Sequence, residues 1–195
     1  MVFITIGEIF DIIIMTVLIG FIFSKYLARY KPISEDPLEE LKKSKSYFGV
    51  SVEDLKFAAM VVAPGIILHE LGHKVVAISF GLSATFNAAY FWLGLGVVLT
   101  LINFGFIFFV PAYVSVVGQA THLQSALIAF AGPFVNLVLW LGAHFALKGR
   151  WFDKKYNSVL GLTAKINMFL FIFNMLPLFF FDGYKVFNGL FHVLF

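Results

Sequence analysis

Two histidines and a glutamate in the sequence His69-Glu70-Leu71-Gly72-His73 have the residue types and the spacing of a zinc hydrolase site. If the segment is helical, residues four apart lie on one face, one turn from each other, so both imidazoles can bind one tetrahedral zinc ion. Glu70 directly follows the first histidine and can act as the base on a water molecule that the metal activates. The motif therefore predicts one zinc ion per chain, with His69 and His73 as ligands and Glu70 as general base.

The setting of this motif is apolar, because hydrophobic runs at 61–68 and 75–80 flank it. Of the 195 residues, 61% are hydrophobic and only 13% are charged, a balance typical of polytopic membrane proteins. The 26 phenylalanines suit a surface that faces lipid. Ionisable groups at membrane depth are costly and usually mark a functional site, so the membrane setting strengthens the prediction of a zinc site.

Charge and cysteine content exclude several other classes of protein. The net charge is only +3 and the basic residues are scattered, which argues against a nucleic-acid partner. The chain has no cysteine, so it has no disulfide, and a zinc ion could be held only by His, Asp or Glu. The expected partner from composition is the lipid bilayer.

The chain is predicted to be an all-α polytopic membrane protein with about five membrane helices. The first apolar run lacks a basic leader and a convincing cleavage site, so we expect a retained anchor rather than a signal peptide. One domain is expected over residues 1–195, with a core at about 57–185. The clear spans are predicted at about 6–26, 55–80, 125–147 and 159–181.

The uncharged segment 81–124 predicts a small β-hairpin or re-entrant element after the zinc-motif helix. Its flanks, 83–92 and 106–117, are rich in aromatic and β-branched residues, which favours strands around a re-entrant dip. The alternative is a full membrane span over 91–110. A full span would place two basic loops on opposite faces of the membrane and Asp182 far from the histidines, so the re-entrant arrangement is preferred.

The polar loop at 29–56 carries six basic and six acidic side chains and is expected to be a solvated surface loop, with a lid over a membrane cavity as the alternative. A short amphipathic helix is predicted at 37–43, and Ser51 is predicted to cap the next helix. The charge rule places this loop in the cytoplasm.

A catalytic zinc usually has three protein ligands, so a third must come from elsewhere in the chain. The remaining histidines, His122, His144 and His192, are expected at interfaces or in packing. Asp182 is the strongest candidate because it follows an apolar run and a helix-breaking Pro177.

Three motifs follow one another along the chain: His69-Glu70-Leu71-Gly72-His73, Gly132-Pro133-Phe134-Val135-Asn136 and Asn174-Met175-Leu176-Pro177-Leu178-Phe179-Phe180-Phe181-Asp182-Gly183. With these motifs the chain resembles the site-2 proteases, a family of intramembrane zinc metalloproteases. The resemblance covers about 57–185 and departs from the family in the length of the uncharged run at 81–124. With no appended soluble regulatory domain, the chain is interpreted as a minimal catalytic core.

The resemblance implies that Asp182 completes the zinc site and that Asn136 and Asn174 engage the substrate backbone near the scissile bond. Hydrogen bonding between helices is the alternative for both asparagines. The resemblance also implies the opposite orientation in the membrane to the charge rule, and absolute topology stays open.

The predicted function is a zinc endopeptidase of the cell membrane that cleaves transmembrane segments of single-span proteins, as in regulated intramembrane proteolysis. The strand-like segment is expected to receive the unwound substrate by β-augmentation. The alternative is a non-enzymatic membrane zinc-binding or metal-transport protein. Glu70 discriminates between the two, because transport needs no general base.

Overall fold

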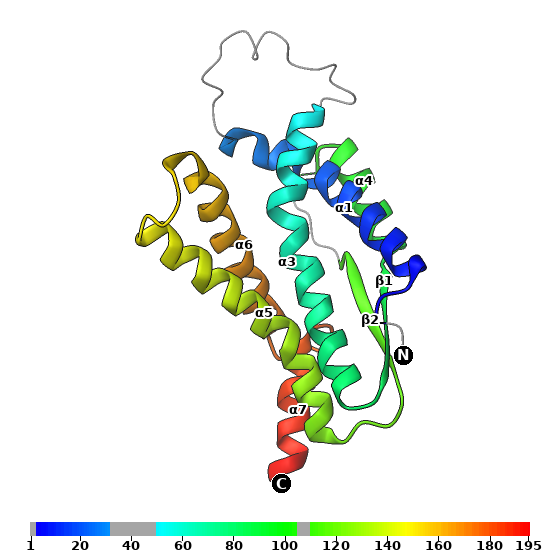
Figure 1. Cartoon of the computed structure of the whole chain (residues 1–195). Coiled ribbons are helices and arrows are strands. Elements are labelled where there is room, and N and C mark those ends of the chain that lie inside the picture. The colour runs from blue at the N-terminus through cyan, green and yellow to red at the C-terminus, as the bar shows by residue number, and fades with distance from the viewer. Residues whose placement is uncertain (1–2, 32–49, 105–109) are drawn as a thin grey trace, which may run out of the picture.

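The central element of the fold is helix α3 (Val52–Ser79), which carries the zinc motif and packs against helices on both sides (Figure 1). The computed structural model describes residues 3–31, 50–104 and 110–195. The side chain of Ser51 accepts a hydrogen bond from the backbone N–H of Asp54 at 3.1 Å, which confirms the predicted N-cap. The predicted helix at 37–43 and most of the polar loop lie outside the described residues.

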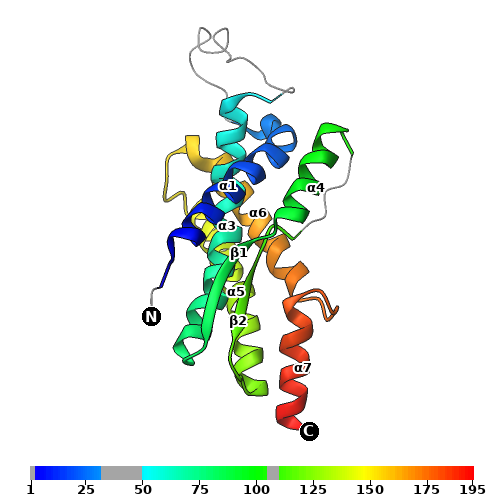
Figure 2. The same cartoon turned by 90° about the vertical axis from the view of Figure 1, so that its right-hand side faces the viewer.

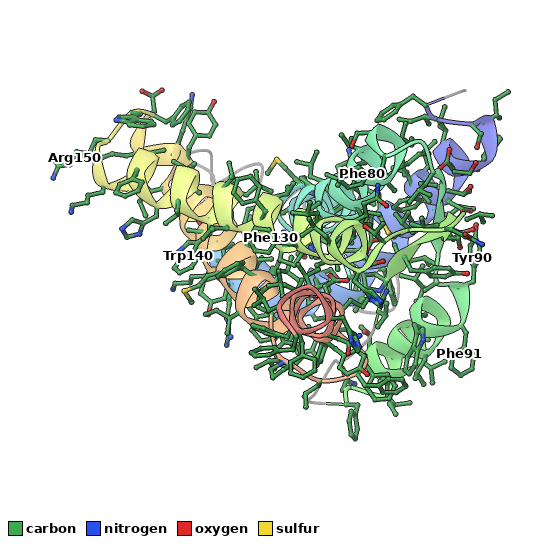
Figure 3. The ribbon with its side chains drawn as sticks, turned by 90° about the horizontal axis from the view of Figure 1, so that it is seen from below. Phe80, Tyr90, Phe91, Phe130, Trp140 and Arg150 are labelled. Carbon is green, nitrogen blue, oxygen red and sulfur yellow. The ribbon has the colours of Figure 1, made fainter. Side chains whose placement is uncertain are left out.

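Four helices of the described residues are long and apolar enough to cross a membrane, where the sequence predicted about five. The two others of any length, α4 (Tyr90–Leu101) and α7 (Asp182–Leu194), are shorter than a membrane span. Large apolar side chains lie exposed around the periphery, as Phe91 shows at 77% exposure (Figure 3). The chain is therefore an all-α membrane protein with a small sheet. The four helices are α1 (Ile6–Leu27), α3, α5 (His122–Lys148) and α6 (Asn157–Asn174).

The directions of the helices bring Asp182, which follows α6, to the depth of His69 and His73 on α3. In Figure 1, α3 and α6 both run from the top of the picture downward, and α5 runs in the opposite direction. Because α5 is the one crossing between them among the described residues, α3 and α6 are parallel, as the re-entrant interpretation of 81–124 requires.

A two-stranded antiparallel sheet lies beside α3, formed by β1 (Ser83–Ala88) and β2 (Ala112–Val117). The register pairs Ala88 with Ala112, so the chain leaves β1 and enters β2 at the same level (Figure 2). The 12 residues of α4 between the strands span about 18 Å, well short of a bilayer core. The structure confirms the hairpin, but it corrects the first strand, because residues 90–92 are helical rather than extended.

The end of α6 also differs from the prediction. The expected span at 159–181 is replaced by a helix that ends at Asn174, and Asp182 begins the next helix, α7. Pro177 explains the break, since proline has no N–H to donate and disfavours a helical conformation in the residue before it.

Candidate active site

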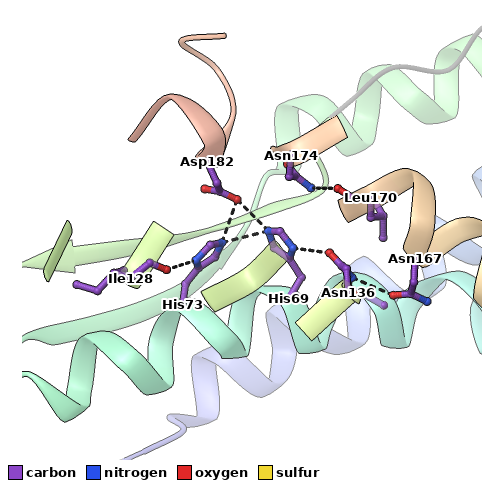
Figure 4. Close-up of polar contacts among 9 residues, drawn as sticks. His69, His73, Ile128, Asn136, Asn167, Leu170, Asn174 and Asp182 are labelled. Carbon is purple, nitrogen blue, oxygen red and sulfur yellow. Dashed lines mark hydrogen bonds and ion pairs between the residues drawn. The ribbon is translucent and has the colours of Figure 1, made fainter. Parts of the chain in front are cut away.

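Three potential metal ligands from two helices converge on one point (Figure 4). Nε2 of His69 lies 3.1 Å from Nε2 of His73, and each of these atoms lies 3.2 Å from Oδ2 of Asp182. Within the described residues, this is the group that brings three ligand atoms of His or acidic residues within 4.8 Å of one another. The structure therefore places all three predicted ligands together, although 113 residues separate the first from the last.

The opposite nitrogen of each imidazole is held by an acceptor on α5. Nδ1 of His69 lies 2.6 Å from Oδ1 of Asn136, and Nδ1 of His73 lies 2.7 Å from the carbonyl oxygen of Ile128. A carbonyl oxygen can only accept, so each Nδ1 donates and each Nε2 keeps its lone pair for a metal. This is the second-layer arrangement that fixes the orientation of zinc-binding histidines.

The spacing of the three atoms fits a tetrahedral zinc ion. Bonds of about 2.0–2.1 Å at tetrahedral angles place neighbouring ligand atoms about 3.3 Å apart. The measured separations of 3.1 and 3.2 Å agree with that spacing. Two lone pairs and a carboxylate oxygen converging at this distance call for a cation between them.

The space for that ion exists because residue 132 is a glycine. A Cβ atom at Gly132 would lie 2.4 Å from Nε2 of His73 and 2.7 Å from Nε2 of His69. A side chain at Gly132 would thus crowd the two atoms that face the metal position. The motif Gly132-Pro133-Phe134-Val135-Asn136 therefore contributes both an open space and an acceptor for His69.

The carboxylate of Asp182 is anchored by the turn before α7. A Cβ at Gly183 would lie 2.5 Å from the carbonyl oxygen of Met175, so only glycine lets α7 begin this close to the end of α6. Oδ2 of Asp182 faces Nε2 of His69 and Nε2 of His73 at 3.2 Å, so a cation bound between the three atoms would favour the ionised carboxylate. Asp182 would then be the anionic ligand of the site.

Asn167 on α6 belongs to the site, and the sequence analysis missed it. Nδ2 of Asn136 donates to Oδ1 of Asn167 at 2.9 Å and to the carbonyl oxygen of Gly65 at 3.0 Å. Nδ2 of Asn167 donates in turn to the carbonyl of Thr163 at 2.8 Å. These bonds fix both amides, and they connect α6, α5 and His69. One signal was available in the sequence: Asn167 lies seven residues before Asn174 and shares its helix face.

The predicted substrate residues occupy different positions. Asn136 is fully buried, and its amide is bonded to His69, Gly65 and Asn167, which is the interhelical bonding considered as the alternative. Asn174 lines the cavity in front of the site and donates to the carbonyl of Leu170 at 2.9 Å. A contact of either residue with substrate stays a prediction.

The site opens into a cavity of about 1340 Å³. His69, Glu70, His73 and Asp182 all line it, and the strand β2 forms another part of its wall. Glu70 is thus placed beside the metal position with access to a bound molecule. The remaining histidines lie elsewhere: the rings of His122 and His192 contact each other, and that of His144 contacts Phe145.

The fold and the site together define a class: a helical membrane protein with two histidines and a carboxylate arranged to bind zinc. Comparison with known proteins agrees with this class. The chain is 36% identical over 143 residues to a Methanocaldococcus jannaschii protein named "Putative zinc metalloprotease MJ0611", which covers 72% of this chain and 74% of that protein. It is 26% identical over 132 residues to "Putative zinc metalloprotease sll0528" of Synechocystis sp., covering 68% of this chain and 30% of that protein.

The chain belongs to the zinc metalloprotease family that these relatives represent. No family model matches the chain, and no solved structure matches it.

Proposed function

We propose that this protein is an intramembrane zinc endopeptidase of the site-2 protease type, a multi-pass protein of the cell membrane that cleaves transmembrane segments of single-span proteins. One observation carries the proposal: the cluster of His69, His73 and Asp182 lines a cavity among helices apolar enough to cross a membrane. A hydrolytic site in this cavity is accessible to the peptide bonds of chains embedded in the membrane. Cleavage there is the chemistry that regulated intramembrane proteolysis requires.

The proposed mechanism assigns each group of the site a separate task. His69, His73 and Asp182 hold zinc, which when bound supplies Lewis-acid polarisation of water and of a peptide carbonyl. The carboxylate of Glu70 takes the proton from the attacking water and passes it to the leaving amine. Asn136 and Ile128 keep the two Nδ1–H groups engaged, so both histidines present Nε2 throughout the reaction.

The substrate is proposed to bind in extended form along the outer edge of β2. A helical substrate hides its peptide bonds in its own hydrogen bonds and must unwind before hydrolysis. Ala112 and Val114 pair with β1 residues whose N–H groups point away from β2, so their own N–H groups also point outward. Both residues line the cavity that holds the zinc site. Addition of the unwound segment as a further strand brings it beside the catalytic groups, and Asn174 is proposed to bind its backbone.

The alternative function is membrane zinc binding or transport with the same ligands. The two functions are separated by reconstituting the purified protein in liposomes and measuring two quantities. The first is cleavage of a single-span substrate, detected by the masses of its fragments. The second is zinc flux into liposomes loaded with a zinc-sensitive dye. The proposal expects cleavage within the membrane-spanning segment and no flux, whereas zinc flux without any cleavage would favour transport.

A further inference from the structure

Two carboxylates on the first membrane helix form a cluster with the sheet that the zinc chemistry does not use. Glu8 is 3% exposed and Lys74, the residue directly after His73, is 1% exposed, and the two form an ion pair. Buried charges in a membrane protein are costly and usually serve function. This pair joins α1 to the zinc-motif helix α3.

Both carboxylates also bind the backbone of β1. Oε1 of Glu8 accepts from the N–H of Phe86 at 2.7 Å, and Oδ2 of Asp11 accepts from the N–H of Ala88 at 3.1 Å. Oδ1 of Asp11 accepts from the hydroxyl of Tyr90. The second oxygen of Glu8 accepts from Thr5 in the cap of α1, so every carboxylate oxygen of the two acids is engaged.

The spacing of the two acids on α1 matches the spacing of the outward N–H groups along β1. Residues three apart on a helix have Cβ atoms about 5–6 Å apart. N–H groups on one edge of a strand recur at every second residue, about 6.6 Å apart. Glu8 and Asp11 therefore meet successive outward N–H groups of β1, those of Phe86 and Ala88.

We propose that Glu8 and Asp11 are positioning residues that close the outer edge of β1, so that the extended substrate can add to the sheet at the edge of β2 and in one register. Unpaired strand edges accept other chains, and carboxylates that occupy the N–H groups remove that option. The bond between Glu8 and Lys74 fixes this closed edge relative to the zinc helix, which sets which substrate bond reaches Glu70. This inference rests on the proposed proteolytic function.

The test uses the zinc-loaded full chain with a single-span substrate, with the scissile bond located by mass spectrometry. The variant Asp11→Ala is expected to retain zinc and to raise KM about fivefold, the ratio expected when one hydrogen bond that positions the sheet is lost. Some cleavage is expected to move by two residues, because a strand slips in steps that preserve its faces. Asp11→Asn keeps an acceptor for Ala88 and is expected to restore the original bond.

Two further variants keep the experiment decisive. Tyr90→Phe removes, at an exposed position, the hydroxyl that orients Asp11, and it should shift cleavage in the same direction. This variant therefore replaces Asp11→Ala in the test if Asp11→Ala loses zinc or does not fold. Asp153→Ala changes an exposed acid outside the sheet and should leave KM and the bond unchanged. A purely structural role of Asp11 would lower the folded fraction without moving the bond.

The inference is overturned if the folded variants cleave only the wild-type bond with the wild-type KM. Absence of cleavage by the wild-type protein would instead overturn the proposed proteolytic function, so the two failures are distinguishable.

Discussion

Oδ1 of Asn136 lies 2.6 Å from Nδ1 of His69, and this contact links helix α5 to the metal position. Because Nδ2 of Asn136 is bonded to Gly65 and Asn167, the amide cannot turn over without losing two hydrogen bonds. The contact therefore fixes which nitrogen of His69 faces the metal.

Removal of this support should weaken zinc binding without removing a ligand. We expect Asn136→Ala to lower zinc affinity about 10- to 100-fold, and Asn167→Ala about tenfold, because loss of a second-layer partner frees the imidazole. Competition with a chelating dye measures both. The matched control is Asn174→Ala, which lies outside this network and should bind zinc like the wild type. Equal zinc affinity in all four proteins would refute the positioning role of Asn136 and Asn167.

Gly132 should tolerate no side chain. In Gly132→Ala the added methyl group would lie 2.4 Å from Nε2 of His73, so we expect loss of bound zinc as measured by elemental analysis. Gly142→Ala on the same helix is the control, since a Cβ there meets nothing within 4 Å. That control should keep its zinc and gain up to about 1 kcal/mol of helix stability. A Gly132→Ala protein with full zinc content would contradict the assigned metal position.

The ion pair between Lys74 and Glu8 should matter for stability. Lys74→Met leaves the carboxylate of Glu8 buried without its cation, and loss of one partner of a buried pair costs about 3–5 kcal/mol. Unfolding in mixed micelles measures the free energy. Lys155→Met is the control, because Lys155 is 66% exposed beside Asp153 at 3.7 Å, and we expect a change within about 0.5 kcal/mol. Similar losses of unfolding free energy in Lys74→Met and Lys155→Met would show that the buried ion pair contributes no more to stability than the exposed one.

The edge of β2 can be tested with proline. Val114→Pro removes an outward N–H without removing a bond to β1, so the sheet should persist while substrate binding weakens. We expect KM for a helical substrate to rise about fivefold, as for one lost hydrogen bond. Val114→Ala keeps the N–H and serves as the control. Ala88→Pro would instead remove the N–H that donates to Asp11, so it tests the edge of β1 and not the edge of β2. Unchanged kinetics in Val114→Pro would argue against strand addition.

The sequence predicted the parts of the fold that depend on local pattern. The spacing of His69 and His73 and the strand composition around the uncharged segment translate directly into one helix face and one hairpin. The helix break after Asn174 was misplaced by several residues, because hydrophobicity continues through the turn to Phe181 and conceals it.

Contacts between distant segments could not be predicted in the same way. Lys74 is buried in an ion pair with Glu8, which lies 66 residues away in the sequence, and no local pattern connects the two residues. Glu8 and Asp11 likewise accept hydrogen bonds from the backbone of β1, 78 and 77 residues further along the chain. A carboxylate that caps a strand leaves no periodic pattern in a sequence, so its partner emerges only from the tertiary arrangement.

The central claim is that Glu70 performs proton transfer at a zinc site made by His69, His73 and Asp182. The most direct measurement is made on purified Glu70→Gln, with zinc content and cleavage of a transmembrane peptide determined on the same sample. The substitution keeps the shape of the side chain and removes its basic carboxylate, so the account predicts wild-type zinc content and a loss of cleavage of at least about 100-fold. A zinc-loaded Glu70→Gln protein that cleaves at the wild-type rate would contradict it.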